Sequence, residues 1–339
     1  MTNRAAKKQA FLEHTQWDKA TSVMVAGDAS NRSYDRLTKA NGSTAILMNA
    51  PPEKGEDVRP FITILNILIN QKLSAPKLLA CEEDNGFLLL EDLGDDLFAR
   101  VCEQDQTIEY NLYKAAIDVL LDLHRATIPN GIPPYDMTTY LRETDLLTDW
   151  YLPAATGQKS STDIITAYRD QMHAACIKIE DTKPVLVLRD YHAENLLWLP
   201  ERTGTQKVGL LDFQDALIGH PAYDLVSLLE DARRDTSPEL QQNMKEYFIN
   251  KSGLEADAFS YAYATIGAQR NLKIIGIFAR LCVRDKKPHY VDMIPRVWNH
   301  LQRDLSHPEL VSLKTWIAAH VPTPTADILL QIKEATYAA

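Results

Sequence analysis

LRDYHAENLL at Leu188–Leu197 and VGLLDFQDALIGHPAYDL at Val208–Leu225 are the two segments that decide the fold of this 339-residue chain. Their apolar runs predict short strands, and three side chains that carry oxygen lie beside them. These are Asp190, Asn195 and Asp212, at sequence spacings of five and seventeen residues. Mg²⁺ prefers oxygen ligands, so the amide and the second carboxylate are candidate metal ligands. The first aspartate is left to act on a substrate.

This set of side chains fits phosphoryl transfer. That reaction needs alignment, neutralisation of charge and one group that accepts the proton of the attacking hydroxyl. A purely structural polar cluster is the alternative, because an Asp-x4-Asn spacing also occurs by chance in solvated loops. The flanking apolar strands favour the catalytic interpretation, with Asp190 as base.

The first ninety or so residues predict an antiparallel sheet with one main helix. An Asn41-Gly42 turn and an Asp84-Asn85-Gly86 turn separate short apolar runs, which is typical of hairpins. The sequence FITILNILINQ at residues 61–71 has helical periodicity. The predicted strands are 23–25, 34–38, 44–48 and the two runs that flank residues 84–86.

Helices are predicted from about residue 95 onward. NLYKAAIDVLLDLHR at residues 111–125 places its apolar residues on one helical stripe. Similar patterns recur in ELQQNMKEYFIN, YAYATIGAQRNLKIIGIFARL and ELVSLKTWIAAH. Two short apolar strands, PVLVL and VGLL, lie either side of a turn that contains Gly204.

Composition and charge exclude several classes of partner. The chain is 45% apolar and 24% charged, with a formal net charge of -10 and no dense run of Lys or Arg. Nucleic acids and anionic membranes both require concentrated positive charge, so we expect neither as a partner. No apolar stretch approaches the length of a signal peptide core or of a membrane span. We expect a cytoplasmic monomer.

Several strings resemble known kinases. RDYHAENLL resembles the catalytic loop of the protein kinase-like superfamily, and DFQ stands where the metal-binding DFG stands. Four further strings occur in the same order as in the aminoglycoside-phosphotransferase-related sugar kinases. They are GDASNRSYDRL, ILMNAPPE, LLLEDLGDDLF and QRNLKIIGIFARL. Within that group, the chain is most similar to the anomeric N-acetylmuramate/N-acetylglucosamine kinases of bacterial cell-wall recycling.

The resemblance implies an α+β, bilobal, protein kinase-like fold. A small antiparallel β lobe with one main helix, residues 1–93, would bind the nucleotide. A large, mainly helical lobe, residues 94–339, would carry the catalytic loop and bind the substrate. The implied reaction is phosphorylation of the sugar's C1 hydroxyl by ATP with Mg²⁺, with Asp190 as base and Asn195 and Asp212 on the metal.

The resemblance also implies nucleotide and substrate contacts. A phosphate-covering loop, a hinge that meets adenine and a residue beneath the ring would bind ATP, although a plain hairpin turn and core packing explain the same residues. The residues are Gly27, Ser30, Asn31, Arg32, Glu91, Asp92, Leu93 and Leu197. The expected sugar contacts, for which a solvated helix face or a structural histidine is the alternative, are Glu143, His192, Arg270 and Asn271.

Two positions depart from the kinase pattern. Met48 stands where kinases carry a strand lysine that pairs with the phosphates of ATP, and Leu188 stands where the catalytic loop has a histidine. Either Arg32 or Arg36 can supply the missing positive charge. The departures keep a second hypothesis open, a nucleotide-binding pseudokinase without turnover. A kinase of an aminoglycoside, choline or homoserine is the alternative within catalysis.

Overall fold

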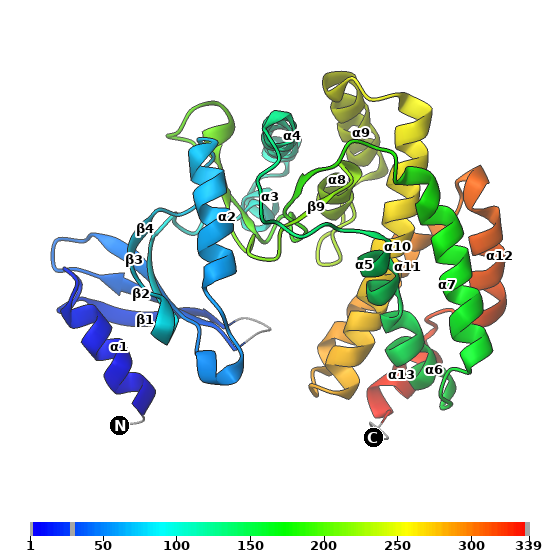
Figure 1. Cartoon of the computed structure of the whole chain (residues 1–339), viewed down its shortest axis with the longest axis horizontal. Coiled ribbons are helices and arrows are strands. Elements are labelled where there is room, and N and C mark those ends of the chain that lie inside the picture. Colours follow the sequence, from blue (N-terminus) through cyan, green and yellow to red (C-terminus); the bar gives the residue numbers. More distant parts are fainter. Residues whose placement is uncertain (1–2, 28–30, 336–339) are drawn as a thin grey trace. The chain divides into compact units, whose positions relative to one another are not determined.

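The computed structural model describes residues 3–27 and 31–335, and the chain divides into two compact units (Figure 1). The first unit comprises Met1–Val119 and Glu194–Ala216, and the second comprises Leu120–Ala193 and Leu217–Ala339. The chain therefore passes from one unit into the other inside the LRDYHAENLL segment. The lobe boundary between residues 93 and 94 stays a prediction.

A five-stranded antiparallel sheet forms the core of the first unit, in the spatial order β1-β2-β3-β5-β4. Gly86 makes the turn between the last two strands possible: its φ is +65°, and a Cβ there would lie 1.9 Å from the Ala50 carbonyl oxygen. The strands confirm those predicted, with longer ends. They are β1 (Thr21–Gly27), β2 (Ser33–Thr38), β3 (Thr44–Asn49), β4 (Leu78–Glu82) and β5 (Phe87–Glu91).

Helices complete the first unit. The predicted helix is α2 (Arg59–Asn70), which buries four apolar residues at helical spacing, and its Phe61 ring stacks on Phe213 at 4.8 Å. Helix α1 (Asn3–Glu13) was not predicted, because Phe11 and Leu12 are its only apolar core residues among those described. The remaining helices of this part of the chain are α3 (Phe98–Gln104) and α4 (Glu109–Arg125), which continues into the second unit.

The two strands predicted around Gly204 do not pair with each other. VGLL forms β8 (Val208–Leu210), which pairs with β7 (Leu196–Trp198) in the first unit. PVLVL forms β6 (Val185–Val187), which pairs with β9 (Leu217–Gly219) in the second unit. Each two-stranded ladder therefore fixes one end of the LRDYHAENLL segment.

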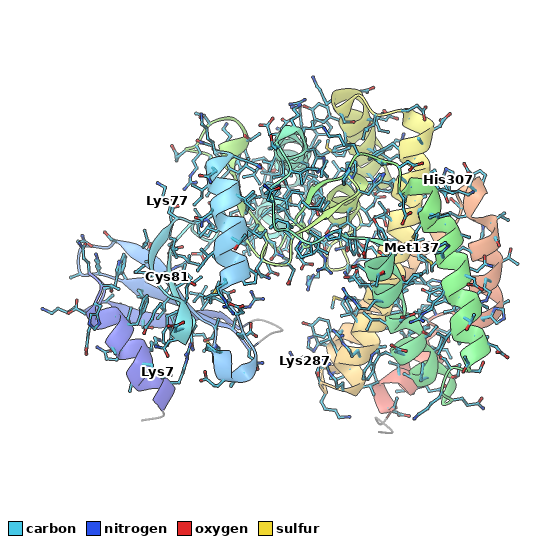
Figure 2. All side chains as sticks on the ribbon, in the orientation of Figure 1. Lys7, Lys77, Cys81, Met137, Lys287 and His307 are labelled. Carbon is cyan, nitrogen blue, oxygen red and sulfur yellow. The ribbon has the colours of Figure 1, made fainter. Side chains whose placement is uncertain are left out.

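The second unit is helical. Its longest helix, α10 (Ala256–Val283), contacts α5, α7, α8 and α11. Figure 2 draws the side chains of this unit and labels Met137, the first residue of α5. Gly276 allows α10 to approach the backbone of Leu146 closely, since a Cβ there would lie 2.3 Å from the Leu146 carbonyl carbon. The other helices are α5 (Met137–Thr144), α6 (Leu152–Thr156), α7 (Thr162–Cys176), α8 (Ala222–Leu229), α9 (Pro238–Ser252), α11 (Ile294–Asp304), α12 (Val311–His320) and α13 (Ala326–Glu334).

No helix in residues 3–27 or 31–335 has both the length and the apolar composition that a membrane span requires.

Buried neutral histidines should make the second unit sensitive to acid. His220 is 7% exposed, its Nδ1 accepts the Ala222 N–H at 3.0 Å at the start of α8, and burial lowers its pKa to about 4. The unfolded chain binds this proton at a pKa of about 6.5. Stability is therefore complete above pH 6.5 and is lost as the pH falls toward 4. We expect one such histidine to lower the free energy of unfolding by about 2 kcal/mol at pH 5.

Urea unfolding at pH 5 and pH 7.5 measures this effect. His220→Gln keeps a hydrogen-bond acceptor but does not titrate, so the loss of stability between the two pH values should shrink. His289→Gln, a change of an exposed histidine, is the matched control. Equal pH dependence of the wild type and both variants would contradict the prediction.

Candidate functional site

The predicted base lies in a backbone turn that the second unit holds tightly. The buried Asp224 carboxylate of α8 accepts the N–H groups of Leu188 at 2.7 Å and Arg189 at 2.8 Å. The Ser227 hydroxyl donates to the Arg189 carbonyl oxygen at 3.0 Å. Arg189 has a φ of +71°, in the left-handed region that favours glycine. Helix α8 therefore fixes the residue before Asp190 in a conformation that it would rarely adopt alone.

Leu188, which replaces the histidine of the kinase pattern, is buried with 3% exposure. Its N–H is one of the two that Asp224 accepts. An apolar side chain in the core thus anchors this end of the loop. Burial is also the main reason that the pKa of Asp224 rises to about 7.

Glu143, predicted as a sugar contact, lies inside a charged network. Its carboxylate accepts hydrogen bonds from the Arg189 guanidinium and the Tyr135 hydroxyl, and the Lys273 ammonium lies 2.8 Å away. Burial alone would raise the pKa of Glu143, but the two cations lower it below its ordinary value. The network joins α5, α10 and the residue next to Asp190, and the substrate role of Glu143 stays a prediction.

His192 is also buried, with 5% exposure. Its Nε2 lies 3.5 Å from an Arg233 guanidinium nitrogen, and burial lowers its pKa to about 4. The ring is therefore neutral near pH 7 and can bind a substrate by hydrogen bonds but not as a cation. Its contact with a sugar stays a prediction.

Arg270 and Asn271, the other predicted sugar contacts, face the interior of the second unit. Arg270 is 6% exposed and donates to the Ser227 hydroxyl at 2.8 Å. Asn271 is fully buried and donates to Glu230 at 2.7 Å and Asp304 at 2.9 Å. These partners all belong to the second unit, and contact with a substrate stays a prediction for both.

The two predicted metal ligands lie together in the first unit. The Asn195 amide nitrogen is 3.4 Å from Asp212 Oδ2, and the Gln214 amide donates to Asp212 Oδ1 at 2.9 Å. Strands β7 and β8 produce this pairing, because the Leu211 N–H donates to the Asn195 carbonyl oxygen at 3.0 Å. Asp212 itself has a φ of +55°.

The chemistry of this pair fits Mg²⁺, which takes carboxylate and amide oxygens and retains water and phosphate ligands. The described residues contain no group of three His, Cys, Asp or Glu side chains arranged to hold a metal. A divalent ion held by this pair would have further coordination positions for water and phosphate oxygens.

Arg32 connects the metal-ligand pair to an acidic residue near α2. Its Nη2 lies 3.8 Å from Asp212 Oδ1 and its Nε lies 3.6 Å from Glu56 Oε2. The Asn31 N–H donates to the same Glu56 carboxylate at 2.9 Å. Met48, at the position of the kinase lysine, is an apolar core residue with 1% exposure. Arg32 thus places a cation beside Asp212.

Arg36, the other candidate for the missing charge, is held by one carboxylate of the predicted hinge and one that follows it. It binds Asp92 at 2.7 Å and Asp95 at 2.8 Å, and hydrogen bonds to these two carboxylates raise its pKa. The Glu91 carboxylate is bound by Arg202 at 2.8 Å. The hinge side chains therefore stabilise the first unit, while their backbone contact with adenine stays a prediction.

The remaining predicted nucleotide residues belong to the first unit. Gly27 ends β1 and is paired with Ser33, Leu93 packs near Gly209, and Leu197 is a buried residue of β7. Ser30 lies outside the described residues. Contact of these residues with ATP stays a prediction.

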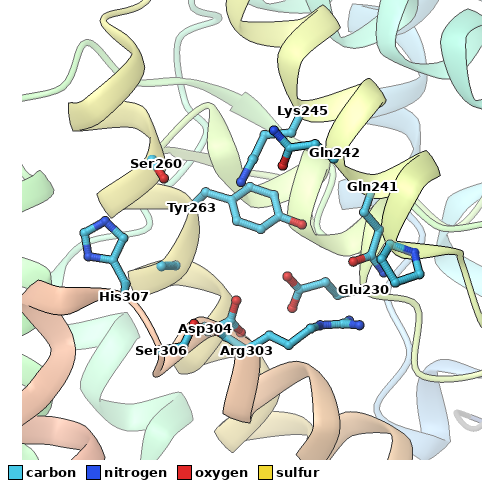
Figure 3. A pocket seen from close by; sticks show the side chains of 12 residues that line it. Glu230, Gln241, Gln242, Lys245, Ser260, Tyr263, Arg303, Asp304, Ser306 and His307 are labelled. Atoms are coloured by element: carbon cyan, nitrogen blue, oxygen red, sulfur yellow. Dashed lines mark hydrogen bonds between the residues drawn. The ribbon is translucent and has the colours of Figure 1, made fainter.

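A pocket of about 320 Å³ opens among α9, α10 and α11, and none of the predicted site residues is among those that line it. Glu230 and Asp304 face each other in it (Figure 3), and Asn271 donates to both. Burial and the neighbouring carboxylate raise the pKa of Asp304 far above its ordinary value. Burial also raises the pKa of Glu230.

The sequence analysis missed Tyr135, Lys273 and Gln214. Lys273 stands two residues after Asn271 inside QRNLKIIGIFARL, and helical spacing alone does not show that it reaches Glu143. Gln214 is the third residue of the DFQ string, but the string does not show that its amide binds Asp212. No sequence signal identified Tyr135.

Comparison with solved structures tests the predicted fold. The ADP-bound aminoglycoside phosphotransferase APH(2'')-Ib matches 88% of this chain and 97% of its own, with 14% identity and a TM-score of 0.59. At that identity the match shows the fold alone. The predicted α+β, bilobal, kinase-like fold is confirmed.

The chain belongs to the phosphotransferase enzyme family, whose sequence profile matches residues 23–259. A curated relative from Caulobacter vibrioides, named N-acetylmuramate/N-acetylglucosamine kinase, is 38% identical and covers 96% of this chain and 98% of its own. A relative of the same name from Pseudomonas aeruginosa is 32% identical over 88% of each chain. The protein is therefore a small-molecule kinase with an alcohol group as acceptor.

Replacing Asp224 should impair both folding and turnover. In Asp224→Asn an amide N–H₂ group would face one of the two backbone N–H groups, so one buried donor would lose its acceptor. We expect a loss of about 1–3 kcal/mol in the free energy of unfolding and a fall in kcat. Asp235→Asn, at an exposed ion pair with Arg296, should change stability by less than about 1 kcal/mol.

Urea unfolding and kcat at saturating substrate measure both effects. Wild-type values for Asp224→Asn would show that the backbone turn does not depend on this carboxylate.

Proposed function

We propose that the protein is an ATP- and Mg²⁺-dependent sugar kinase that phosphorylates the C1 hydroxyl of N-acetylmuramate, N-acetylglucosamine or both, in peptidoglycan recycling. The observation that carries the proposal is the 38% identity, over 96% of the chain, to a kinase named for these two sugars. The rigid turn before Asp190 and the Asn195–Asp212 pair support it.

In the proposed reaction Asp190 takes the proton of the C1 hydroxyl as its oxygen bonds to the γ-phosphorus of ATP and the bond from that phosphorus to the leaving oxygen of ADP breaks. The products are a sugar 1-phosphate and ADP. Asn195 and Asp212 would hold Mg²⁺, which supplies neutralisation of the charge on the phosphate oxygens.

Arg32 would place its positive charge on the nucleotide phosphates, with Glu56 orienting the guanidinium. Gly27, Ser30, Asn31, the hinge 91–93 and Leu197 would complete the ATP contacts. Glu143, His192, Arg270 and Asn271 would contact the sugar.

Substitution of the proposed base tests the chemical step. ADP release with Mg-ATP is measured for N-acetylmuramate, N-acetylglucosamine, kanamycin, choline and homoserine, and phosphorus NMR identifies any product. We expect an acid-labile anomeric phosphate on one or both amino sugars, and a loss of about 10²–10⁴-fold in kcat for Asp190→Asn. Asp170→Asn, at an exposed residue of α7, is the matched control.

Turnover of another compound alone would replace the proposed substrate and keep the catalytic residues. No turnover of any compound would favour the pseudokinase. Full activity of Asp190→Asn would remove its role as base.

The two arginines of the first unit should have separable effects. Arg32→Met removes the cation beside Asp212, so we expect kcat/KM for ATP to fall about 10–100-fold, the range for lost hydrogen bonds to charged groups. Arg36→Met removes the bonds to Asp92 and Asp95 and should mainly lower the free energy of unfolding. Steady-state kinetics with varied ATP and urea unfolding distinguish the two. A larger loss of kcat/KM for ATP in Arg36→Met than in Arg32→Met would assign the phosphate contact to Arg36 instead.

A further inference from the structure

The pocket among α9, α10 and α11 lies within the second unit, because all of its lining residues fall between Leu217 and Ala339. Its volume of about 320 Å³ lies in the range of roughly 300–1,000 Å³ that is usual for small-molecule sites. Exposed residues, among them Gln242 and Ser306, form part of its lining, so a ligand can enter from solvent. None of the residues proposed for phosphoryl transfer lines this pocket.

The floor of the pocket carries two buried carboxyl groups in fixed positions. Glu230 directly follows α8 and Asp304 ends α11, and they are 4% and 5% exposed. The Asn271 amide of α10 donates to one oxygen of each. Gly267 makes room for the Asp304 carboxyl group, since a Cβ at that position would lie 2.6 Å from its carbon. Glycine inside a helix costs about 1 kcal/mol relative to alanine, and here it allows this carboxyl group to occupy its place.

Positive side chains line the same pocket nearer to solvent. Lys245 of α9 and His307 are half-buried, and Arg303 of α11 is exposed. The Lys245 ammonium lies 5.4 Å from the centre of the buried Tyr263 ring, and the charge of Arg303 opposes the rise in the pKa of both floor carboxyl groups. Figure 3 shows the Lys245, Tyr263 and Arg303 side chains around the same space. The pocket thus presents carboxyl groups in its depth and cations near its opening.

The protonation of the floor selects between two kinds of ligand group. Burial raises the pKa of Glu230, and burial together with the charge of Glu230 raises the pKa of Asp304 far above its ordinary value. A carboxyl group that holds a proton donates one hydrogen bond, whereas a carboxylate only accepts. A ligand hydroxyl both donates and accepts, so it suits this pair in either state, but an ammonium group only donates. The floor therefore favours hydroxyl groups.

The opening favours an anion at the opposite end of the same ligand. Lysine and arginine both bind phosphate, the lysine as a point charge and the arginine through two parallel hydrogen bonds. A phosphorylated sugar meets both requirements, since its ring carries hydroxyl groups and its phosphate carries negative charge. The Tyr263 ring supplies apolar surface for the ring carbons.

We propose that this pocket binds a phosphorylated sugar, with ring hydroxyl groups on Glu230 and Asp304 and the phosphate at Lys245 and Arg303. The site is separate from the proposed catalytic residues and does not rest on the proposed function, although a sugar 1-phosphate is also the product of that reaction. The alternative is an acidic pair that only ties the end of α8 to α10 and α11 through Asn271, in a pocket filled by solvent. Such a pair would stabilise the fold and bind no ligand.

Isothermal titration calorimetry of the full chain without nucleotide tests the proposal, with N-acetylglucosamine 1-phosphate as the probe. We expect the wild type to bind it, and Lys245→Met to bind it about tenfold or more weakly, the usual effect of a lost hydrogen bond to a charged group. Ser260→Phe, at a half-buried residue of the lining, fills the pocket and should abolish binding there. Lys251→Met, at an exposed lysine of α9 that does not line the pocket, is the matched control. Thermal unfolding checks that each variant folds.

Probe bound at the proposed catalytic residues would be unaffected by both pocket variants, so a loss of affinity in them assigns the binding to the pocket. No binding by the wild type, or equal binding by the wild type and both pocket variants, would overturn the proposal. Inorganic phosphate that binds as tightly as the sugar phosphate would remove the sugar from it, and N-acetylglucosamine that binds as tightly would remove the phosphate. Tighter binding of 4-aminobutyrate, which has an ammonium and a carboxylate but no hydroxyl group, would overturn the choice of hydroxyl groups.

Discussion

The second unit depends on one fully buried carboxylate. Asp224 accepts two consecutive backbone N–H groups, those of Leu188 and Arg189, and so stabilises a left-handed residue directly before the proposed base. Removing a carboxylate from water is costly unless hydrogen bonds replace its hydration. Here the bonds go to the backbone, so the position of the turn is coupled to α8 itself. The Ser227 hydroxyl, one helical turn later, holds the carbonyl of the same residue and receives a hydrogen bond from Arg270.

Two arginines of the first unit have different partners, and the sequence alone could not tell which of them lies near the proposed metal ligands. Arg36 lies within β2 and faces the hinge, where two carboxylates bind it. Arg32 precedes the same strand and lies beside Asp212 and Glu56. Electrostatic stabilisation of phosphate charge depends on where the cation lies, and not on which strand carries it. A guanidinium also presents several donors in a fixed plane, which suits phosphate oxygens.

Much of the fold could be predicted from the sequence, because strand alternation, turn residues and helical periodicity are local signals. The sheet, α2 and the long helices followed from them. Helix α1 did not, since only Phe11 and Leu12 mark its buried side, and the pairing of β6 with β9 depends on contacts between distant residues. At the site, Asn195 and Asp212 were predicted as a pair and lie together. The partners of Glu143 could not be predicted, because residues 189 and 273 meet only in the folded chain.

The substitutions that suggested a pseudokinase have structural explanations that do not require loss of activity. Leu188 is buried, and the hydrogen bond that fixes it comes from its backbone, which any residue except proline supplies. Met48 is buried too, and a cation already lies near Asp212 from outside that strand. A scaffold has no need to hold a left-handed Arg189 against its conformational cost, whereas a base that must meet a hydroxyl within hydrogen-bond reach does. The strained turn therefore favours a kinase over a binding module.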